Sequence, residues 1–158
     1  MDAVVINQFL IATVKVLHDH FHVDIEQSEP PHAIRGNDAL DEVTVLLGIT
    51  GDLEGHFLLG CSTPSALGIA RNMMNNQDYP AFDDLCASAL AELGNMIAGT
   101  TMTQLAGLGH TCNLLPPYVL RAEHAMMKLA VPVVIKLPLK TTVGRIAVCI
   151  GLKEPGKG

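Results

Sequence analysis

Tryptophan is missing from the chain, and aromatic residues of all kinds make up only 4% of its 158 residues. Hydrophobic residues nevertheless account for 49% of the sequence, so a core has to be built mainly from Leu, Ile, Val, Met and Ala. A chain of this length can bury such a core within one domain. We therefore expect a single domain over residues 1–158, with a short flexible tail at about 154–158.

Positive charge is also scarce. The 10 Lys and Arg residues are scattered along the chain, and 16 Asp and Glu residues bring the formal net charge to −6. Proteins that bind nucleic acid or an anionic membrane use concentrated positive charge to attract phosphate groups. The sequence therefore argues against both kinds of partner.

The N-terminus lacks the features of a secretory signal. Its opening stretch, MDAVVINQFLIATVKVLHDH, contains Asp2 and has no Lys or Arg ahead of the apolar residues. An uncharged run follows much later, over 93–120, but Gly, Asn and Gln residues and the pair Pro116-Pro117 interrupt it. Such interruptions are not typical of a transmembrane helix. We expect the protein to be cytoplasmic.

No two cysteines have the C-x-x-C spacing of a redox pair or a zinc site. The four cysteines lie in runs of apolar or small residues, at Cys61, Cys86, Cys112 and Cys149. Free cysteine is among the most buried residue types, and disulfides are rare in reducing compartments. We expect four buried free thiols rather than disulfide partners or metal ligands.

Hydrophobic periodicity predicts three helices. The first covers about 4–21, and a short helix runs from Thr63 to about 75, with Thr63 as its N-cap and Pro64 at its first helical position. A long helix covers about 82–108, with Gly107 and Gly109 as its end signal.

Apolar and β-branched runs predict strands between these helices. The runs 43–50 and 53–61 are joined by Gly51-Asp52, which is a hairpin signal, and two more runs cover 129–140 and 142–153. Residues 110–123 look extended, and the polar stretch 26–38 is expected to be a loop that contains an edge strand. Pro132 and Pro138 fit strand ends or an edge better than a strand centre. Strands joined by hairpins predict a two-layer α+β fold, in which helices cover one face of an antiparallel sheet.

The long helix has an unusually bare polar face. Residues 88–109, SALAELGNMIAGTTMTQLAGLG, contain one charged side chain, Glu92. At 100° per residue, Ser88, Glu92 and Asn95 fall within about 60° of arc and about 10 Å of axis. The bulky apolar side chains centre roughly 150° away, and they belong to Cys86, Ala89, Leu93 and Ile97, with Leu90 and Met96 beside them. The three polar side chains are therefore expected to point away from the core.

Small residues flank this polar triplet, namely Ala87, Ala91, Ala98 and Gly99. A flat face with a few polar groups suits close approach by another protein, whereas a face that serves solubility alone would carry several Lys and Glu residues. A Glu and an Asn three positions apart are common on exposed helices, so the spacing alone says little. Gly94 and Gly99 add weight, because each costs up to about 1 kcal/mol relative to Ala in a helix.

The motif S-x3-E-x2-N, formed by Ser88, Glu92 and Asn95, lies within ALAELGNMIAG and is followed by LLPPYVL. In this context it resembles the CheC/CheX/flagellar-switch phosphatase family of bacterial chemotaxis. The segments LLGITGDLEGHFLLGCS, SALGIARNMM and VIKLPL are also similar to a first hairpin, a short helix and a late strand of that family. The resemblance covers nearly the whole chain, and it implies an α+β fold with about six antiparallel strands and three helices.

The resemblance also implies an activity, the dephosphorylation of a phosphorylated CheY-type response regulator. It implies that Glu92 pairs with a lysine in the partner's active site, and that Asn95 holds water in line with the partner's acyl phosphate. Ser88 stands where relatives have Asp or Ser, and is expected at the edge of the contact. No cofactor is expected on this chain, since Mg²⁺ belongs to the partner.

The number of motifs separates the branches of the family. CheC-like members have two helices with E-x2-N, whereas here Glu92 is the only Glu followed by Asn three residues later. One site points to the CheX branch, and puts in doubt any dependence on CheD, the CheC partner. Relatives in that branch are homodimers joined through their sheets, so the resemblance implies a homodimer with one site per subunit.

The sequence HDHFH offers a competing site. His18 and His22 are one helical turn apart, with His20 between them and Asp19 nearby, and this spacing can bind a metal such as Zn²⁺. The other interpretation is a solvated helix end, where protonated His interacts favourably with the helix dipole. We favour the second interpretation and assign no metal ligand to the chain.

Two other chemistries lack their motifs. GITGDLEG is glycine-rich, but it lies between two predicted strands and is neither GxGxxG nor GxxxxGK[ST], so it is not a phosphate loop. A Ser or Cys hydrolase is unsupported, because no G-x-S-x-G is present and Ser88 has no His within its own helix.

The remaining alternative is a docking module that binds a receiver domain or a flagellar switch protein through the same face and hydrolyses nothing. The presence of both Glu92 and Asn95 argues against it, since docking alone does not require an amide at the second position.

Overall fold

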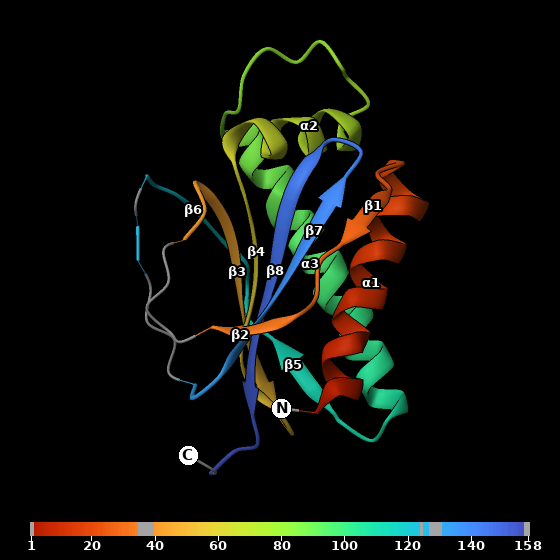
Figure 1. The fold of residues 1–158 in the computed structure, drawn as a ribbon, viewed down its shortest axis with the longest axis vertical. Coiled ribbons are helices and arrows are strands. Elements are labelled where there is room, and N and C mark those ends of the chain that lie inside the picture. The colour runs from red at the N-terminus through yellow and green to blue at the C-terminus, as the bar shows by residue number, and fades with distance from the viewer. Residues whose placement is uncertain (1, 35–39, 124, 127–130, 157–158) are drawn as a thin grey trace.

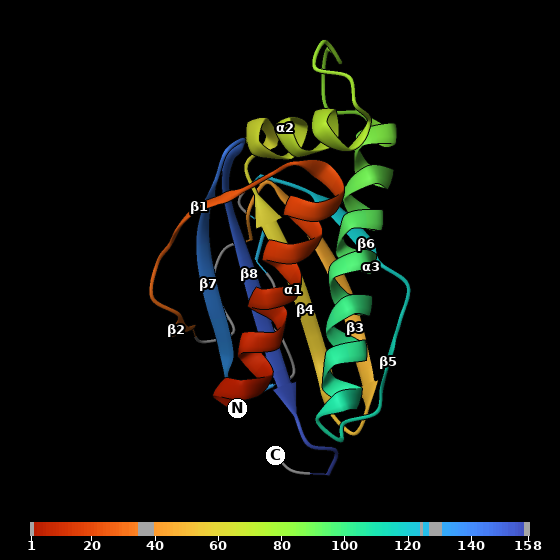
Figure 2. The same ribbon diagram turned by 90° about the vertical axis from the view of Figure 1, so that its right-hand side faces the viewer.

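Three helices lie on one face of an antiparallel sheet in the computed structural model, which describes residues 2–34, 40–123, 125–126 and 131–156. The helices are α1 (Ala3–Phe21), α2 (Thr63–Met73) and α3 (Asp84–Gly107). Figure 2 shows α1 and α3 side by side along the sheet, with α2 across one end of both. The predicted two-layer α+β fold is therefore confirmed.

The described strands form one sheet in which every pair is antiparallel. Its strands are β1 (Ile25–Ser28), β2 (His32–Ile34), β3 (Val43–Gly51), β4 (Glu54–Cys61), β5 (Cys112–Leu114), β6 (Tyr118–Arg121), β7 (Val134–Thr141) and β8 (Gly144–Lys153). The order is β1-β7-β8-β4-β3-β5, and β2 also pairs with β7 while β6 also pairs with β3. The described sheet thus has 8 strands where about six were expected, because each edge is formed by two short strands that pair with the same neighbour.

The core between the two layers is aliphatic, as the composition requires. Phe9 of α1 and Phe57 of β4 stack with ring centroids 5.6 Å apart, and they are the aromatic members of the large, fully buried set. The rest of that set consists of Leu and Ile residues from α1, α2, α3 and the central strands. Leu, Ile and Val side chains fill the layer closely without needing polar partners.

Two helix starts show how local sequence determines the elements. The carboxylate of Asp2 accepts a hydrogen bond from the Val4 N–H at 2.8 Å and caps α1. Before α2 the structure corrects the predicted cap, because Ser62 rather than Thr63 is the N-cap, and its hydroxyl accepts from the Ser65 N–H at 3.3 Å. Thr63 is the first helical residue, and its hydroxyl donates instead to Glu42 at 3.3 Å.

Pro138 corrects a second expectation. Pro132 precedes β7, as predicted, but Pro138 lies inside β7 opposite Ala147 of β8. Its carbonyl accepts a hydrogen bond from the Glu29 N–H at 3.0 Å, and Glu29 follows β1 and precedes β2. The N and O of one strand residue point to the same side, so the missing N–H of Pro138 faces the gap between these two short strands.

Part of the predicted loop 26–38 and part of the predicted run 129–140 lie outside the described residues, as do the last two residues of the tail expected at about 154–158. Within the described part, β8 ends at Lys153 and residues 154–156 are exposed. The described helices include none with the length and apolar character needed to cross a bilayer.

The cysteines are only partly as expected. Cys61 and Cys86 are buried, whereas Cys112 and Cys149 are half-buried. Burial raises the pKa of the Cys61 thiol to about 12, so this side chain stays a neutral thiol. Edge position explains the exposure of Cys112, because β5 is the last strand on its side of the sheet.

Candidate functional site

The N-terminus of α3 is held by a cluster of polar contacts. Asp83 is the N-cap, and one carboxylate oxygen accepts from the Cys86 N–H at 3.1 Å while the other accepts from the Tyr79 hydroxyl at 2.5 Å. These bonds lower the pKa of Asp83, and the bond to Asp83 raises the pKa of Tyr79 to about 12. Arg71 of α2 donates to the Tyr79 carbonyl at 2.9 Å. The start of α3 is therefore tied to α2.

The inner face of α3 packs against α1 and β3. Cys86, Leu90, Leu93, Ile97 and Leu105 are fully buried. Gly94 is buried as well, and a Cβ atom built there would lie 2.7 Å from Cγ1 of Val45 and 3.1 Å from Cδ1 of Leu47. Close contact with β3 therefore accounts for this glycine, which fixes how near the helix lies to the sheet.

The outer face carries the predicted polar triplet. Ser88, Glu92 and Asn95 are all exposed, as their helical angles predicted. Within the described part of the chain none of their side chains makes a hydrogen bond or an ion pair. Burying unpaired polar groups is costly, so a partner that covers this face must satisfy them. The three side chains are available to such a partner.

The surroundings of the triplet differ in part from the expected arrangement. Ala87, Ala91 and Gly99 are half-buried beside it, but Ala98 is fully buried and belongs to the inner face. Ala89, expected in the core, is half-buried. The buried stripe of α3, which contacts both α1 and β3, therefore includes Ala98 and leaves Ala89 partly exposed.

Leu85 was not singled out by sequence reasoning. Its side chain is 57% exposed, and it lies one turn before Ser88 on the same outer stripe of α3. The available signal is its spacing, since a leucine three positions ahead of Ser88 falls on the polar side of the helix. Leu85 thus adds one apolar group to the stripe that carries the polar triplet.

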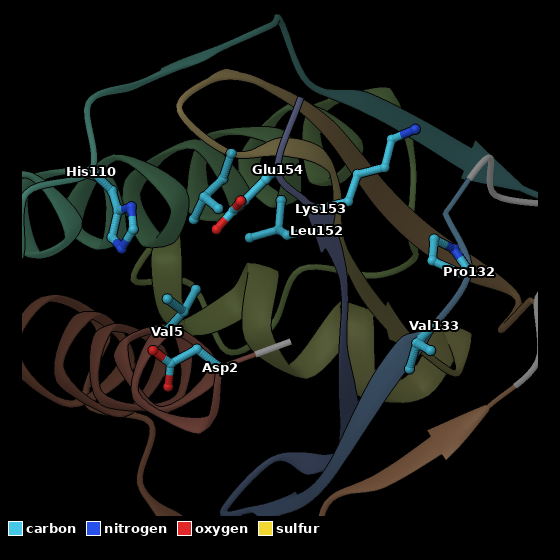
Figure 3. Close-up of a pocket in the computed structure, with 9 residues that line it drawn as sticks. Asp2, Val5, His110, Pro132, Val133, Leu152, Lys153 and Glu154 are labelled. Atoms are coloured by element: carbon cyan, nitrogen blue, oxygen red, sulfur yellow. The ribbon is translucent and has the colours of Figure 1, made fainter. Parts of the chain in front are cut away.

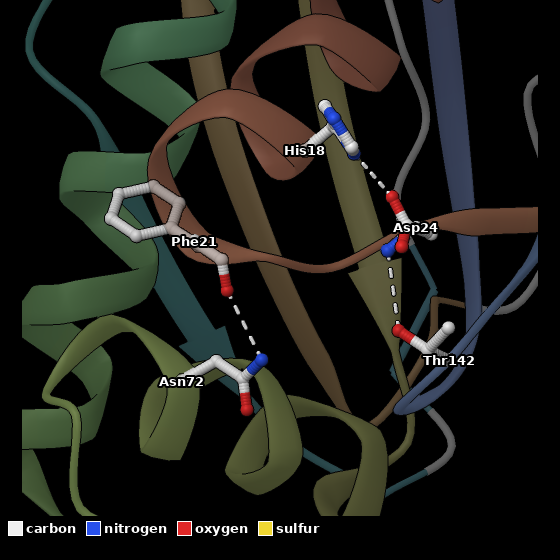
Figure 4. A network of polar contacts seen from close by, with 5 residues as sticks. All are labelled: His18, Phe21, Asp24, Asn72 and Thr142. Carbon is white, nitrogen blue, oxygen red and sulfur yellow. Dashed lines mark hydrogen bonds and ion pairs between the residues drawn. The ribbon is translucent and has the colours of Figure 1, made fainter.

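The histidine segment is built differently from a metal site. His22 is the C-cap of α1, with φ of 56°, so it no longer follows the helical spacing from His18. The His18 ring contacts the carboxylate of Asp24 (Figure 4). This contact raises the pKa of His18. Among the described residues no three His, Cys, Asp or Glu side chains are grouped so as to hold a metal ion.

A hollow of about 430 Å³ lies near the C-terminal end of α3 (Figure 3). Its polar groups include Asp2, which caps α1, and Lys153, whose ammonium lies 3.8 Å from Glu54. His110, which follows α3, also lines it, whereas Ser88, Glu92 and Asn95 do not. Because Asp2 and Lys153 already make these contacts and the triplet lies elsewhere, the outer face of α3 is the stronger candidate site.

The fold is that of a CheC-like superfamily protein of known structure. A CheC-like protein from Shewanella sp. PV-4 has a TM-score of 0.87 at 21% identity, over 97% of this chain and 99% of that one. The family model described as chemotaxis phosphatase CheX matches residues 43–137, more than half of the sequence. The chain therefore belongs to the CheX family of chemotaxis phosphatases.

Two relatives link this family to CheY. The CheY-P phosphatase CheX of Thermotoga maritima is 29% identical over 139 residues, which is 88% of each chain. A solved complex of CheX with CheY, BeF3 and Mg²⁺ from Borrelia burgdorferi has a TM-score of 0.74 at 25% identity, over 94% of this chain and 97% of that one. The chain is thus a homologue of a CheY-P phosphatase.

Proposed function

We propose that the chain hydrolyses the aspartyl phosphate of a CheY-type response regulator, with Asn95 and Glu92 as the residues that act on it. The observation that carries the proposal is the outer face of α3, where both side chains are exposed and unengaged among small residues in a chain of the CheX family. The Thermotoga relative is a CheY-P phosphatase, and the Borrelia complex contains CheY. Both support a CheY-type regulator as the substrate.

Asn95 has the chemistry needed to position water. Its amide donates and accepts hydrogen bonds without ionising, so it can hold a water molecule in line with the phosphorus atom at any physiological pH. The water oxygen attacks phosphorus, the bond between phosphorus and the aspartyl oxygen breaks, and inorganic phosphate and the aspartate carboxylate are released. Positioning of this kind is a large part of catalysis of phosphoryl transfer.

Glu92 has the chemistry needed to anchor the partner. It lies three residues before Asn95 on the same stripe, and no other charged residue stands between Leu85 and Gly107. An ion pair with the lysine of a receiver active site would place the Asn95 amide at the phosphoryl group. Ser88 and Leu85 then lie at the edge of the contact, where they add a polar and an apolar group.

The proposal assigns Mg²⁺ to the regulator, as in the Borrelia complex of CheX with CheY, BeF3 and Mg²⁺, and it requires no metal ligand from this chain. A receiver-domain substrate also places the activity in the cytoplasm.

We further infer a homodimer joined through the sheets, with one site per subunit. The pairs β1/β2 and β5/β6 form the two edges of the described sheet, and they leave backbone groups that a second copy can pair. Light scattering on the purified chain should give the mass of two subunits, and a monomer mass at micromolar concentration would refute this assembly.

Loss of ³²P from phosphorylated receiver domains of the same organism, with Mg²⁺ present, tests the activity. The chain should accelerate the loss from one regulator, Asn95→Ala should abolish the acceleration while binding persists, and Glu92→Ala should weaken binding as well. If Asn95→Ala kept full activity, the assigned mechanism would be wrong. If no regulator lost phosphate faster, the docking-module alternative would replace the phosphatase.

A further inference from the structure

Three glycines occur in α3, and packing does not account for all of them. Gly94 is required by its contact with Val45, but a Cβ atom at Gly99 would meet no atom of the described residues within 4 Å. Gly99 also has no positive φ, so alanine fits its backbone. Glycine in a helix interior is less favourable than alanine. The fold of the free protein therefore gives no reason for glycine at position 99.

The position of Gly99 suggests the reason. It follows Asn95 by four residues, so the two lie one above the other on the same stripe, about 6 Å apart along the axis. Side chains in a helix lean toward the N-terminus and cover the turn before their own Cα. Any side chain at position 99 would therefore lean over the surface beside Asn95.

The other helix neighbours of Asn95 are also short. Ala91, four residues before it, and Ala98, three residues after it, each carry a single methyl group, and Ala98 is fully buried. Glu92 is the one long side chain among the four neighbours. Among these four helix neighbours, only Glu92 therefore rises as high as the Asn95 amide.

We propose that Gly99 is a positioning residue, which provides the clearance for the acyl-phosphate site of a phosphorylated receiver domain to reach the Asn95 amide. The inference rests on the proposed function and assigns a role to a residue outside the E-x2-N motif. A displacement of about 1 Å can cost roughly 100-fold in rate, so a side chain that props the two proteins apart has a large effect.

Gly107 supplies a matched control. Gly107 lies in the same helix, and a Cβ atom there also meets no atom of the described residues within 4 Å. It is about 18 Å along the axis from Asn95.

Gly99→Ala should raise Tm by about 2–4 °C, because it adds helix propensity and removes no contact. The hydroxyl of Thr103 donates to the Gly99 carbonyl at 3.2 Å, and this bond is kept when the side chain changes.

The decisive measurement is kcat/KM for hydrolysis of the phosphorylated receiver domain by Gly99→Leu, Gly99→Ala, Gly107→Leu and Asn95→Ala. Gly99→Leu should lose about 10-fold or more, and Gly107→Leu should keep the wild-type value. The loss should appear in kcat, because the Asn95 amide is held away from the phosphoryl group, and in a higher KM and a weaker Kd for the receiver domain loaded with BeF3⁻ and Mg²⁺, a mimic of the phosphorylated state. Gly99→Ala should show a smaller loss together with its higher Tm, a combination that misfolding does not produce.

Wild-type kcat/KM in Gly99→Leu would overturn the inference, as would an equal loss in Gly107→Leu. These failures are distinct from failure of the proposed function. If Asn95→Ala abolishes hydrolysis while Gly99→Leu retains it, only the clearance role is wrong. If Asn95→Ala itself remains active, the assigned mechanism fails, and with it the role of Gly99.

Discussion

Adding a methyl group at Gly94 should destabilise the protein, although alanine is the better helix former. The added Cβ atom would lie 2.7 Å from Cγ1 of Val45, and relief to an ordinary contact requires about 0.7 Å of movement. Overpacking of this kind costs about 1–3 kcal/mol. Replacing glycine in a helix recovers up to about 1 kcal/mol. We therefore expect Gly94→Ala to lower the free energy of unfolding by about 1–2 kcal/mol.

A double-mutant cycle with Val45→Ala tests the cause. Val45 is fully buried, so its truncation alone is destabilising, but it removes the Cγ1 atom that the new methyl group meets. The Cβ atom of residue 45 lies 3.6 Å from the position of the added Cβ, which is an ordinary contact. The double variant should therefore be about 1 kcal/mol more stable than the sum of the two single changes predicts.

Urea unfolding of the four proteins measures these free energies, and m should stay constant across them. Additivity within about 0.5 kcal/mol would refute the proposed contact. The contact would also be refuted if Gly94→Ala raised the free energy of unfolding, as Gly99→Ala is expected to do. Gly94 sets the distance between α3 and the sheet, so we also expect Gly94→Ala to lower both kcat/KM and stability. Gly99→Ala should lower kcat/KM without loss of stability.

Three further predictions concern caps and titrating groups. Ser62→Ala should lower Tm by about 2–4 °C through loss of the α2 cap, and more than Thr63→Ala, as thermal unfolding of both variants will show. Burial lowers the pKa of His56, whose Nδ1 atom has no hydrogen-bond partner in the described part, so the unfolded chain binds more protons and stability should fall below pH 6.5. His56→Gln should flatten that dependence in urea titrations between pH 5 and 7, and an unchanged slope would contradict the assignment. Asp24 raises the pKa of His18, so this pair stabilises the fold below pH 6.5 and the contribution disappears as pH rises through the raised pKa, a trend that His18→Asn should remove.

Local patterns in the sequence were sufficient for the helices and the central hairpin. The 3.6-residue spacing predicted α1 over 4–21, and the structure has Ala3–Phe21. Gly51 and the two apolar runs predicted β3 and β4, and Gly51 has φ of 115° at the turn. These features depend on residues within a few positions of one another, and so the sequence contains them directly.

The exposed triplet was also predictable, because helical angle alone separates Ser88, Glu92 and Asn95 from the buried stripe. The roles of Glu92 and Asn95 came from resemblance to a family and not from their spacing. Family membership is now shown, while those two roles remain predictions.

The sequence by itself determined the aliphatic core, the helical and hairpin periods, and the bare polar stripe of α3, since each is a property of composition or of neighbouring residues. Only the tertiary structure decided that two pairs of short strands share the sheet edges, that Pro138 lies inside β7 beside the gap between β1 and β2, and that Ala98 is buried. It also distinguished two glycines that look alike in sequence. A Cβ atom at Gly94 would meet Val45 of β3, whereas one at Gly99 would meet no described atom within 4 Å. This difference was not visible in the sequence, because Val45 lies some fifty residues away in the chain.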